Sequence, residues 1–390
     1  MKNMDLLDAQ DWTFPVPISY GPGRLREIAS LCAKAGSNRP LIVTDRGSRN
    51  LCFIEQTEQY LLAAGMMTAI YSDISPNPKD DEIAAGRAMY REGKHDGIIA
   101  IGGGSGMDAG KAICLTANNE VELLSFNYDN AVPDVPGHSF PPLITIPTTA
   151  GTGAETESTG MITDTSRRMK LCVWHPLLKP SVALLDPEVT VGLPANLTAW
   201  TGCDAMIHAI EAYCVPGFHP LCDGVALEAL RLIHTWLPTA VENGDSLEAR
   251  GGMLVGSCLA GVAFLKGLGL VHAISHMVGA EYNTHHGLTN SIVLPAALRF
   301  NAPSISDKIP TMAAAMQLQS PDFDEFYATI CSRLDQFEIP KTLLDIGVPN
   351  DCAAEMAKRA HQDAAASTNP RDLTVVDIER VIEEALTTGR

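Results

Sequence analysis

The sequence has 390 residues, of which 46% are hydrophobic and 19% are charged, and its formal net charge at pH 7 is −18. A chain of this length exceeds what one hydrophobic core usually fills, so we expect two domains of roughly 150 to 200 residues each. The acidic balance argues against a nucleic acid or an anionic membrane surface as the main partner, because neither supplies the cations that such a protein attracts.

Neither the cysteines nor the N-terminal residues indicate export. The ten cysteines form no CxxC pair, which fits neither a disulfide framework nor a cysteine zinc site. The first twenty residues lack a basic start followed by an apolar stretch, so we expect no secretory signal and a cytoplasmic location. The longest apolar stretch, Gly251 to Leu265, is shorter than the ~20 residues of a membrane-spanning helix and is interpreted as a buried core helix.

In the first half, short apolar runs alternate with helical patterns. Four runs bounded by Gly, Pro or Asp predict strands at 40–45, 67–72, 96–101 and 142–147. Helices are predicted at 52–65 and 79–94, and further strands at 169–174 and 181–186. This alternation predicts a mostly parallel sheet with helices on its faces.

The pattern changes at about Pro194, where long amphipathic helical segments such as 224–237 follow one another. We therefore expect an α/β N-terminal domain over residues 1–193 and an all-α C-terminal domain over residues 194–390. The boundary is predicted in a short turn at 191–196, because no linker-like tract separates the halves.

A glycine-rich turn follows the strand predicted at 96–101. Gly104, Gly106 and Ala109 match the G-x-G-x-x-A form of a dinucleotide-binding fingerprint, in which backbone N–H groups and a helix N-terminus receive phosphate oxygens. The acidic residue expected about 20 positions later is not in place. A P-loop is excluded, because Ala112 follows Lys111 where Ser or Thr is required.

Two other segments are candidates for dinucleotide contacts. Asp45 ends a predicted strand, where an open α/β sheet presents its ligand-binding edge, and could accept both ribose hydroxyls and repel a 2′-phosphate. NAD would then be favoured over NADP. Capping of the next helix is the alternative for Asp45. The loop 146–158, rich in Thr and Gly, could cover a pyrophosphate or nicotinamide, although such a loop by itself is more often only a turn.

The C-terminal half contains a carboxylate and several histidines at metal-ligand spacing. Asp204 and His208 are four residues apart, as are His272 and His276, so each pair would share one helix face, and His286 follows. Three imidazoles and one carboxylate suit a divalent first-row metal such as iron(II) or zinc, whereas calcium and magnesium prefer more oxygen ligands. An isolated pair of this kind is more often a surface or capping feature than a ligand pair.

The five motifs at 41–45, 98–113, 146–158, 202–213 and 267–287 together resemble those of the iron-containing, or group III, alcohol dehydrogenases. Their order and spacing agree from about residue 12 to beyond residue 300. The resemblance implies a dehydroquinate synthase-like superfold, with an NAD-binding α/β domain and a helical metal-binding and catalytic domain. It also implies an NAD(H)-linked dehydrogenase for small primary alcohols or hydroxy acids, which is most commonly a dimer.

The resemblance also implies roles for individual positions. The implied metal ligands are Asp204, His208, His272 and His286, with iron(II) expected first and zinc as the alternative. His276 would relay a proton or orient the substrate. The implied cofactor contacts are Asp45 at the ribose, Gly103, Gly104 and Ser105 at the pyrophosphate, Thr148, Thr149 and Thr152 over the dinucleotide, and Lys170 near the nicotinamide. The candidate substrate residues are Thr159, Phe264, Lys266 and His285.

Two positions depart from the family pattern. Lys266 stands where a small polar residue is usual, and His285 stands where many relatives have Pro or another non-basic residue. We expect these side chains to give the pocket a positive potential and to favour a carboxylate-bearing substrate such as an ω-hydroxy acid. The alternative is that Lys266 points to solvent from a helix end.

Three other functions remain open at this point. A dehydroquinate synthase-like lyase would use NAD transiently but would need basic residues around a phosphorylated substrate, and few lie near the histidines. A metal-dependent hydrolase would leave the glycine turn and Asp45 without a role. A binding protein without catalysis would give no NADH with any alcohol.

Overall fold

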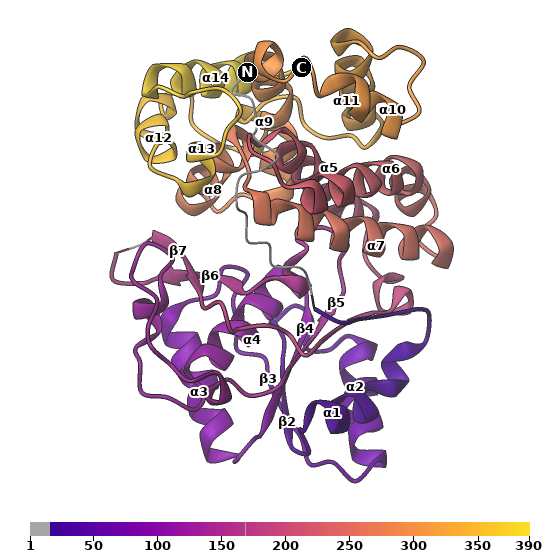
Figure 1. Cartoon of the computed structure of the whole chain (residues 1–390), viewed down its shortest axis with the longest axis vertical. Coiled ribbons are helices and arrows are strands. Elements are labelled where there is room, and N and C mark those ends of the chain that lie inside the picture. Colours follow the sequence, from indigo (N-terminus) through magenta and orange to yellow (C-terminus); the bar gives the residue numbers. More distant parts are fainter. Residues whose placement is uncertain (1–15, 168) are drawn as a thin grey trace. The chain divides into compact units, whose positions relative to one another are not determined.

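The computed structural model of the chain describes residues 16–167 and 169–390. These residues form two compact units, which divide in the sequence between Leu193 and Pro194 (Figure 1). The first unit is a parallel sheet with helices and the second is helical. The predicted fold class is therefore confirmed.

Six parallel strands form the sheet of the first unit, in the order β1-β8-β5-β4-β2-β3. Their bounds are β1 Ile18–Tyr20, β2 Pro40–Val43, β3 Ala69–Tyr71, β4 Gly97–Gly102, β5 Leu143–Pro147 and β8 Val182–Leu185. Every residue of β2, β4, β5 and β8 is buried. Continuous apolar runs are typical of such strands because both faces of the sheet are covered.

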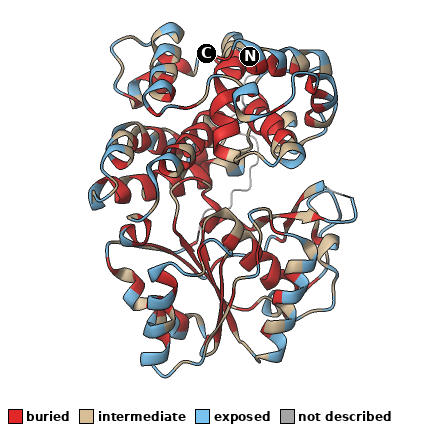
Figure 2. Ribbon diagram, turned by 180° about the vertical axis from the view of Figure 1, so that it is seen from behind, coloured by how far each residue is buried: buried red, intermediate tan, exposed pale blue. Residues whose placement is uncertain are grey.

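Two pairs of helices cover the two faces of this sheet (Figure 1). They are α1 Ile28–Ala35 and α2 Cys52–Ala63 on one face, and α3 Asp80–Glu92 and α4 Gly104–Thr116 on the other. Successive side chains of β4 point to opposite faces: Ile99 and Ile101 join the core under α1 and α2, while Ile98 and Ala100 join the core under α3 and α4. Figure 2 shows the strands as the most continuously buried part of this unit.

A separate antiparallel hairpin consists of β6 Thr159–Asp164 and β7 Met169–Trp174. The sequence patterns predicted β7 and β8 but missed β6 and β1. β1 has three residues, two of them exposed, so it carries no apolar run. Along β6, buried positions alternate with half-buried ones, and Thr and Gly occupy several of them, so the run is less apolar than those of the main sheet.

The second unit is built from helices throughout its described residues. The long helices are α5 Ala195–Cys214, α6 Pro220–Glu242, α7 Leu247–Ala263, α8 Leu270–Tyr282 and α9 His286–Asn301. The shorter ones are α10 Ile309–Ala315, α11 Phe323–Gln336, α12 Ala353–Ala360, α13 Ala364–Ser367 and α14 Val375–Thr387. Helix α5 packs against α6, α7 and α9, and α8 packs against α9, so α5, α8 and α9 meet in one core.

Helix α7 is the apolar segment that was interpreted as a core helix. The stretch Leu247–Lys266 is long and apolar enough to cross a membrane, but 67% of its most apolar window is buried in the protein. It approaches α6 closely, because a Cβ atom at Gly252 would lie 2.2 Å from Trp236 Cδ1 and one at Gly256 would lie 2.9 Å from Ile233 Cγ1. The apolar character of α7 is thus accounted for by packing against its neighbours.

Candidate active site

The glycine-rich turn and the threonine-rich loop lie side by side at the carboxyl ends of β4 and β5. A Cβ atom at Gly103 would lie 3.6 Å from Thr149 Cγ2, and one at Gly104 would lie 3.1 Å from Thr152 Cγ2. The Thr148 amide donates to the Gly102 carbonyl oxygen at 2.9 Å. Gly103 is the N-cap of α4, whose first backbone N–H groups have no partner within the helix. This edge of the sheet therefore combines anion-binding amides with nearby hydroxyls.

Asp45 lies next to the same turn, two residues after β2 ends. Its carboxylate accepts hydrogen bonds from the Ser48 amide at 3.0 Å and the Ser48 hydroxyl at 2.8 Å. A Cβ atom at Gly102 would lie 3.2 Å from Asp45 Oδ2. The helix-capping alternative is wrong, because α2 begins only at Cys52 and its N-cap is Leu51. Ser105, in the first turn of α4, donates its hydroxyl to the Pro76 carbonyl oxygen at 3.0 Å.

Three charged side chains lie beneath this edge, one buried and two half-buried, and the sequence analysis identified only one of them as a cofactor contact, Lys170. Burial lowers the pKa of Lys170, and the charge of Asp108 on α4 opposes this shift. Lys111, also on α4, is fully buried and donates to the Ala154 carbonyl oxygen at 2.8 Å. Lys111 thereby ties the threonine-rich loop to the helix. The sequence offered a hint of this role, because Lys111 stands in an otherwise apolar stretch of α4. The sequence analysis used Lys111 only to exclude a P-loop.

In the helical unit, Asp204, His208, His272 and His286 converge. Each offers one ligand atom, and these four atoms all lie within 4.8 Å of one another. Asp204 Oδ1 is 3.8 Å from His208 Nε2 and 3.7 Å from Nε2 of both His272 and His286. Helix α5 supplies Asp204 and His208 from one face, α8 supplies His272, and His286 is the first residue of α9.

The chemistry of this cluster fits a divalent first-row metal. Although burial raises the pKa of Asp204, the imidazoles of His208 and His286 hold it well below its usual range, so the carboxylate is charged. Ligand atoms about 2.0 to 2.2 Å from one ion stand roughly 3 to 4 Å apart, which matches the Asp204 separations. Three imidazole nitrogens and one carboxylate suit iron(II) or zinc rather than calcium or magnesium.

Comparison with known proteins identifies the family. The iron-containing alcohol dehydrogenase model matches residues 15–187, and the model of the C-terminal part of the Fe-containing alcohol dehydrogenase family matches residues 198–386. The chain belongs to the iron-containing alcohol dehydrogenase family. It is therefore an oxidoreductase that acts on CH–OH groups, and the family match selects the dehydrogenase over the lyase, hydrolase and binding-protein alternatives.

Several relatives in this family are similar to the chain over their full length. The NAD-dependent methanol dehydrogenase of Bacillus methanolicus is 36% identical, with 94% of this chain and 97% of the relative covered. The 4-hydroxybutyrate dehydrogenase of Cupriavidus necator is 34% identical, with 93% and 96% covered. A crystal structure of a 1,3-propanediol oxidoreductase superposes with a TM-score of 0.92 at 34% identity and covers 97% of this chain and 100% of that one.

Three further residues contact the four proposed metal ligands or His276, and the sequence analysis missed them. Glu211 accepts a hydrogen bond from His272 Nδ1 at 2.6 Å. Asn290 Nδ2 donates to Asp204 Oδ1 at 2.7 Å. Asp363 Oδ2 lies 3.0 Å from Nδ1 of His276, whose ring stacks on that of His286 with centroids 5.5 Å apart. Glu211 lies on the same face of α5 as Asp204, so helix spacing could have identified it as a neighbour of the ligands. Asp363 is 87 residues from His276, so no spacing in the sequence could have paired the two.

The candidate substrate residues do not share one environment: Phe264 and His285 pack against aromatic rings of the helical unit, whereas Thr159 lies in the first unit. The ring of Phe264 packs on His208, with centroids 5.0 Å apart. His285 is the N-cap of α9: its Nδ1 accepts from the Leu288 amide at 3.4 Å, and burial lowers its pKa. Its ring packs on Trp200. Thr159 starts β6 in the first unit, where it pairs with Trp174.

Lys266 does not point to solvent, because its side chain is only 3% exposed and donates to Asp223 Oδ1 at 2.5 Å. The solvent-facing alternative is therefore wrong. Since the charge of Asp223 balances that of Lys266, and burial favours neutral His285, neither side chain supplies the uncompensated positive charge that was expected to select carboxylates.

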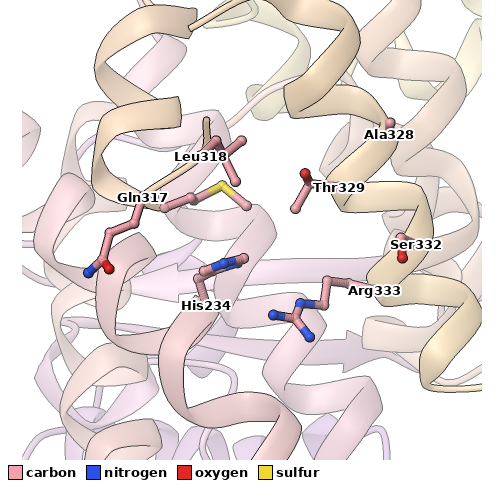
Figure 3. A pocket seen from close by; sticks show the side chains of 8 residues that line it. His234, Gln317, Leu318, Ala328, Thr329, Ser332 and Arg333 are labelled. Carbon is pink, nitrogen blue, oxygen red and sulfur yellow. The ribbon is translucent and has the colours of Figure 1, made fainter. Parts of the chain in front are cut away.

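A pocket of about 410 Å³ lies elsewhere in the helical unit, between α6 and the segments that follow α10 and form α11 (Figure 3). Residues lining it include His234, Gln317, Thr329, Ser332 and Arg333. None of the metal-cluster residues lines this pocket, so it does not form part of the candidate active site.

Proposed function

We propose that the protein oxidises small primary alcohols or hydroxy acids with NAD and reduces the matching aldehydes with NADH. The convergence of Asp204, His208, His272 and His286 carries this proposal, because this donor set suits a divalent first-row metal. Similar proteins act on methanol, 1,3-propanediol and 4-hydroxybutyrate by their names, which supports a small substrate.

The roles of the residues follow from their chemistry. When bound, the metal polarises the substrate oxygen, and the dinucleotide exchanges a hydride with the substrate carbon. Asp204 and the three imidazoles would hold the ion, and Phe264 packs on one of those imidazoles. Asp363 holds Nδ1 of His276, which leaves Nε2 as the atom that exchanges a proton with the substrate side or with water.

We assign the dinucleotide to the edge formed by the glycine turn and the threonine loop. Gly103, Gly104 and Ser105 would receive the pyrophosphate at the start of α4, and Thr148, Thr149 and Thr152 would cover it. Lys170 would lie toward the nicotinamide. Asp45 would accept the ribose hydroxyls and repel a 2′-phosphate, so NAD is the expected cofactor.

The remaining assignments are coarser. Iron(II) is the ion we expect first and zinc the alternative, because metal availability decides between them as much as the donor set does. We also propose that the NAD-binding domain, expected over residues 1–193, is formed by its described residues from 16 onward, and that residues 194–390 form the metal-binding and catalytic domain. Residues 1–15 lie outside the described part of the chain. A homodimer in the cytoplasm is the state that the family resemblance favours.

An activity screen tests the proposal. Protein loaded separately with iron(II) and with zinc is given alcohols with NAD or NADP, and NADH or NADPH formation is followed by absorbance. We expect activity with NAD, and loss of both bound metal and activity in Asp204→Asn. Asp377→Asn, at the start of α14 and outside the proposed site, is the matched control and should keep both. If NADH does not form from any alcohol in the metal-loaded protein, the proposal fails.

The substrate class is tested through Lys266. Because Asp223 balances the charge of Lys266, replacing Lys266 with Met should leave the ratio of kcat/KM for 4-hydroxybutyrate and 1-butanol within about threefold of the wild-type ratio. A charge that selected carboxylates would be worth more than this in a buried site. A collapse of the ratio toward 1-butanol would instead show that Lys266 recognises the carboxylate.

A further inference from the structure

Glu211 is a buried carboxylate that lies beside the proposed metal ligands without being one of them. It is on α5, seven residues after Asp204 and three after His208, so it shares their helix face. Its side chain is 7% exposed. Because a charged group is costly to bury without partners, its hydrogen bonds indicate what it does.

Three donors converge on the Glu211 carboxylate. Oε2 accepts from His272 Nδ1 at 2.6 Å and from the Gly269 amide at 3.1 Å, while Oε1 accepts from the Val271 amide at 2.8 Å. Both amides belong to the start of α8, so Glu211 also caps the helix that carries His272. All three contacts require an acceptor at Glu211, and therefore a proton on Nδ1 of His272.

In a neutral His272 the other ring nitrogen is then an acceptor, and Asn290 Nδ2 lies 3.1 Å from it. With the proton on Nδ1, the lone pair is on Nε2, which lies 3.7 Å from Asp204 Oδ1 and faces the cluster. Carboxylate partners of this kind fix the tautomer and ring orientation of metal-binding histidines, and their loss typically costs 10- to 100-fold in metal affinity.

A second acceptor at the same helix start offers a comparison. Asn369 Oδ1 accepts from the Leu270 amide at 3.1 Å, and Asn369 exchanges hydrogen bonds with Asn301. A Cβ atom at Gly269 would lie 2.9 Å from Glu211 Oε1 and 3.0 Å from Asn369 Oδ1, so the two acceptors enclose this glycine. Asn369 and Glu211 thus both cap α8, but of these two only Glu211 reaches the imidazole of His272.

We propose that Glu211 is a positioning residue that holds His272 in the Nδ1–H tautomer with Nε2 directed at the metal, and thereby sets the affinity of the site for the ion. This inference rests on the proposed metal site. It assigns the affinity of that site to a residue that does not itself touch the ion.

The test compares Glu211→Gln with Asn369→Ala. Zinc affinity of the metal-free full-length proteins is measured by competition with a chelating indicator, and the site is defined as the one that Asp204→Asn abolishes. Glu211→Gln puts an amide NH₂ group among three donors, so zinc should bind about 10 to 100 times more weakly. Asn369→Ala weakens the cap of α8 without touching His272, so zinc affinity should stay within about threefold.

The outcomes separate this inference from the proposed function. If the wild type itself binds no zinc at the Asp204 site, the proposed function fails. If the wild type binds zinc but Glu211→Gln binds it equally well, or if Asn369→Ala loses as much affinity, the role of Glu211 is only structural. The tautomer can also be read in the metal-free wild type by NMR with ¹⁵N-labelled histidine, which requires no variant. A neutral His272 that carries its proton on Nε2 and none on Nδ1 would overturn the inference.

Discussion

Single residues around the metal cluster divide its work between holding the ion and orienting the groups near it. Asp204 keeps its charge in a buried position because imidazoles surround it. Glu211 and Asp363 each face Nδ1 of a histidine, His272 and His276, so the Nε2 atoms are left to face the chemistry. The two carboxylates thus make the same kind of contact for different purposes: Glu211 orients a proposed metal ligand, and Asp363 orients the proposed proton relay.

Replacing Asp363 with Asn should separate these functions. His276 Nδ1 and the Ala365 amide face different oxygens of the Asp363 carboxylate, and in asparagine one of these oxygens becomes an NH₂ group that cannot accept. Without a fixed tautomer at His276, we expect kcat to fall by about ten- to a hundredfold, which is less than the roughly hundredfold or more that an acid–base group itself contributes. Metal content, measured by elemental analysis of the same samples, should not change, because Asp363 does not contact the four proposed ligands. A parallel loss of metal would contradict this assignment.

Glu157, in the threonine-rich loop, gives the protein a pH-dependent stability. Burial raises its pKa to about 7, mainly because the charged form is desolvated, and Lys111 only partly opposes this. Since the folded-state pKa lies above the unfolded value, the contribution of Glu157 is full below pH 4.5 and is lost as the pH rises through about 7.

Glu157→Gln should therefore stabilise the protein above neutral pH. We expect the free energy of unfolding to rise by up to about 3 kcal/mol at alkaline pH, with a difference near zero below pH 4.5. Denaturant titrations at a series of pH values measure this difference. An equal effect at all pH values would show that the pKa of Glu157 is not raised.

At the scale of elements, the helices of the second unit bring together ligands that are far apart in sequence. Asp204 and His208 form a local pair on α5, and their spacing alone predicts that they share a face. His272 reaches that face only because α8 and α9 pack against each other and α9 packs on α5. Helix periodicity could therefore indicate that Asp204 and His208 lie together. The packing of α8 and α9 brings His272 and His286 to them.

Helix α14, which packs on α9, is held at its start by a capping box. The Thr374 hydroxyl accepts from the Asp377 amide at 3.2 Å, and the Asp377 carboxylate accepts from the Thr374 amide at 3.1 Å. Thr374→Ala should lower the free energy of unfolding by about 1 kcal/mol, measured by denaturant titration. The exposed Thr387→Ala, at the other end of α14, is the matched control and should change stability by less than about 0.5 kcal/mol. Equal losses in both variants would remove the cap as the cause.

At the scale of the whole molecule, the proposed cofactor residues and the proposed metal ligands belong to different units. The first set lies before Leu193 and the second after Pro194. Each unit has its own core, so we expect dinucleotide binding to survive loss of the metal.

Metal removal tests this independence. After treatment with a chelator, the protein should lose activity but bind NADH with a Kd within about threefold of the untreated value, as measured by NADH fluorescence. Readdition of iron(II) or zinc should restore activity. Loss of NADH binding together with the metal would show that the two sites depend on each other.

The sequence by itself determined the alternation of strands and helices in the first half and the change to successive helices at Pro194. It also determined the local residue pairs and turns that carry the family resemblance. These features depend on neighbouring residues, and periodicity and spacing record them. Tertiary structure alone decided which distant groups meet. Glu211 and His272 are 61 residues apart, and His276 and Asp363 are 87 apart. Lys266 was expected to lend its charge to the pocket, but Asp223, 43 residues away, balances it. Such contacts arise from the packing of whole helices, and no spacing along the chain encodes them.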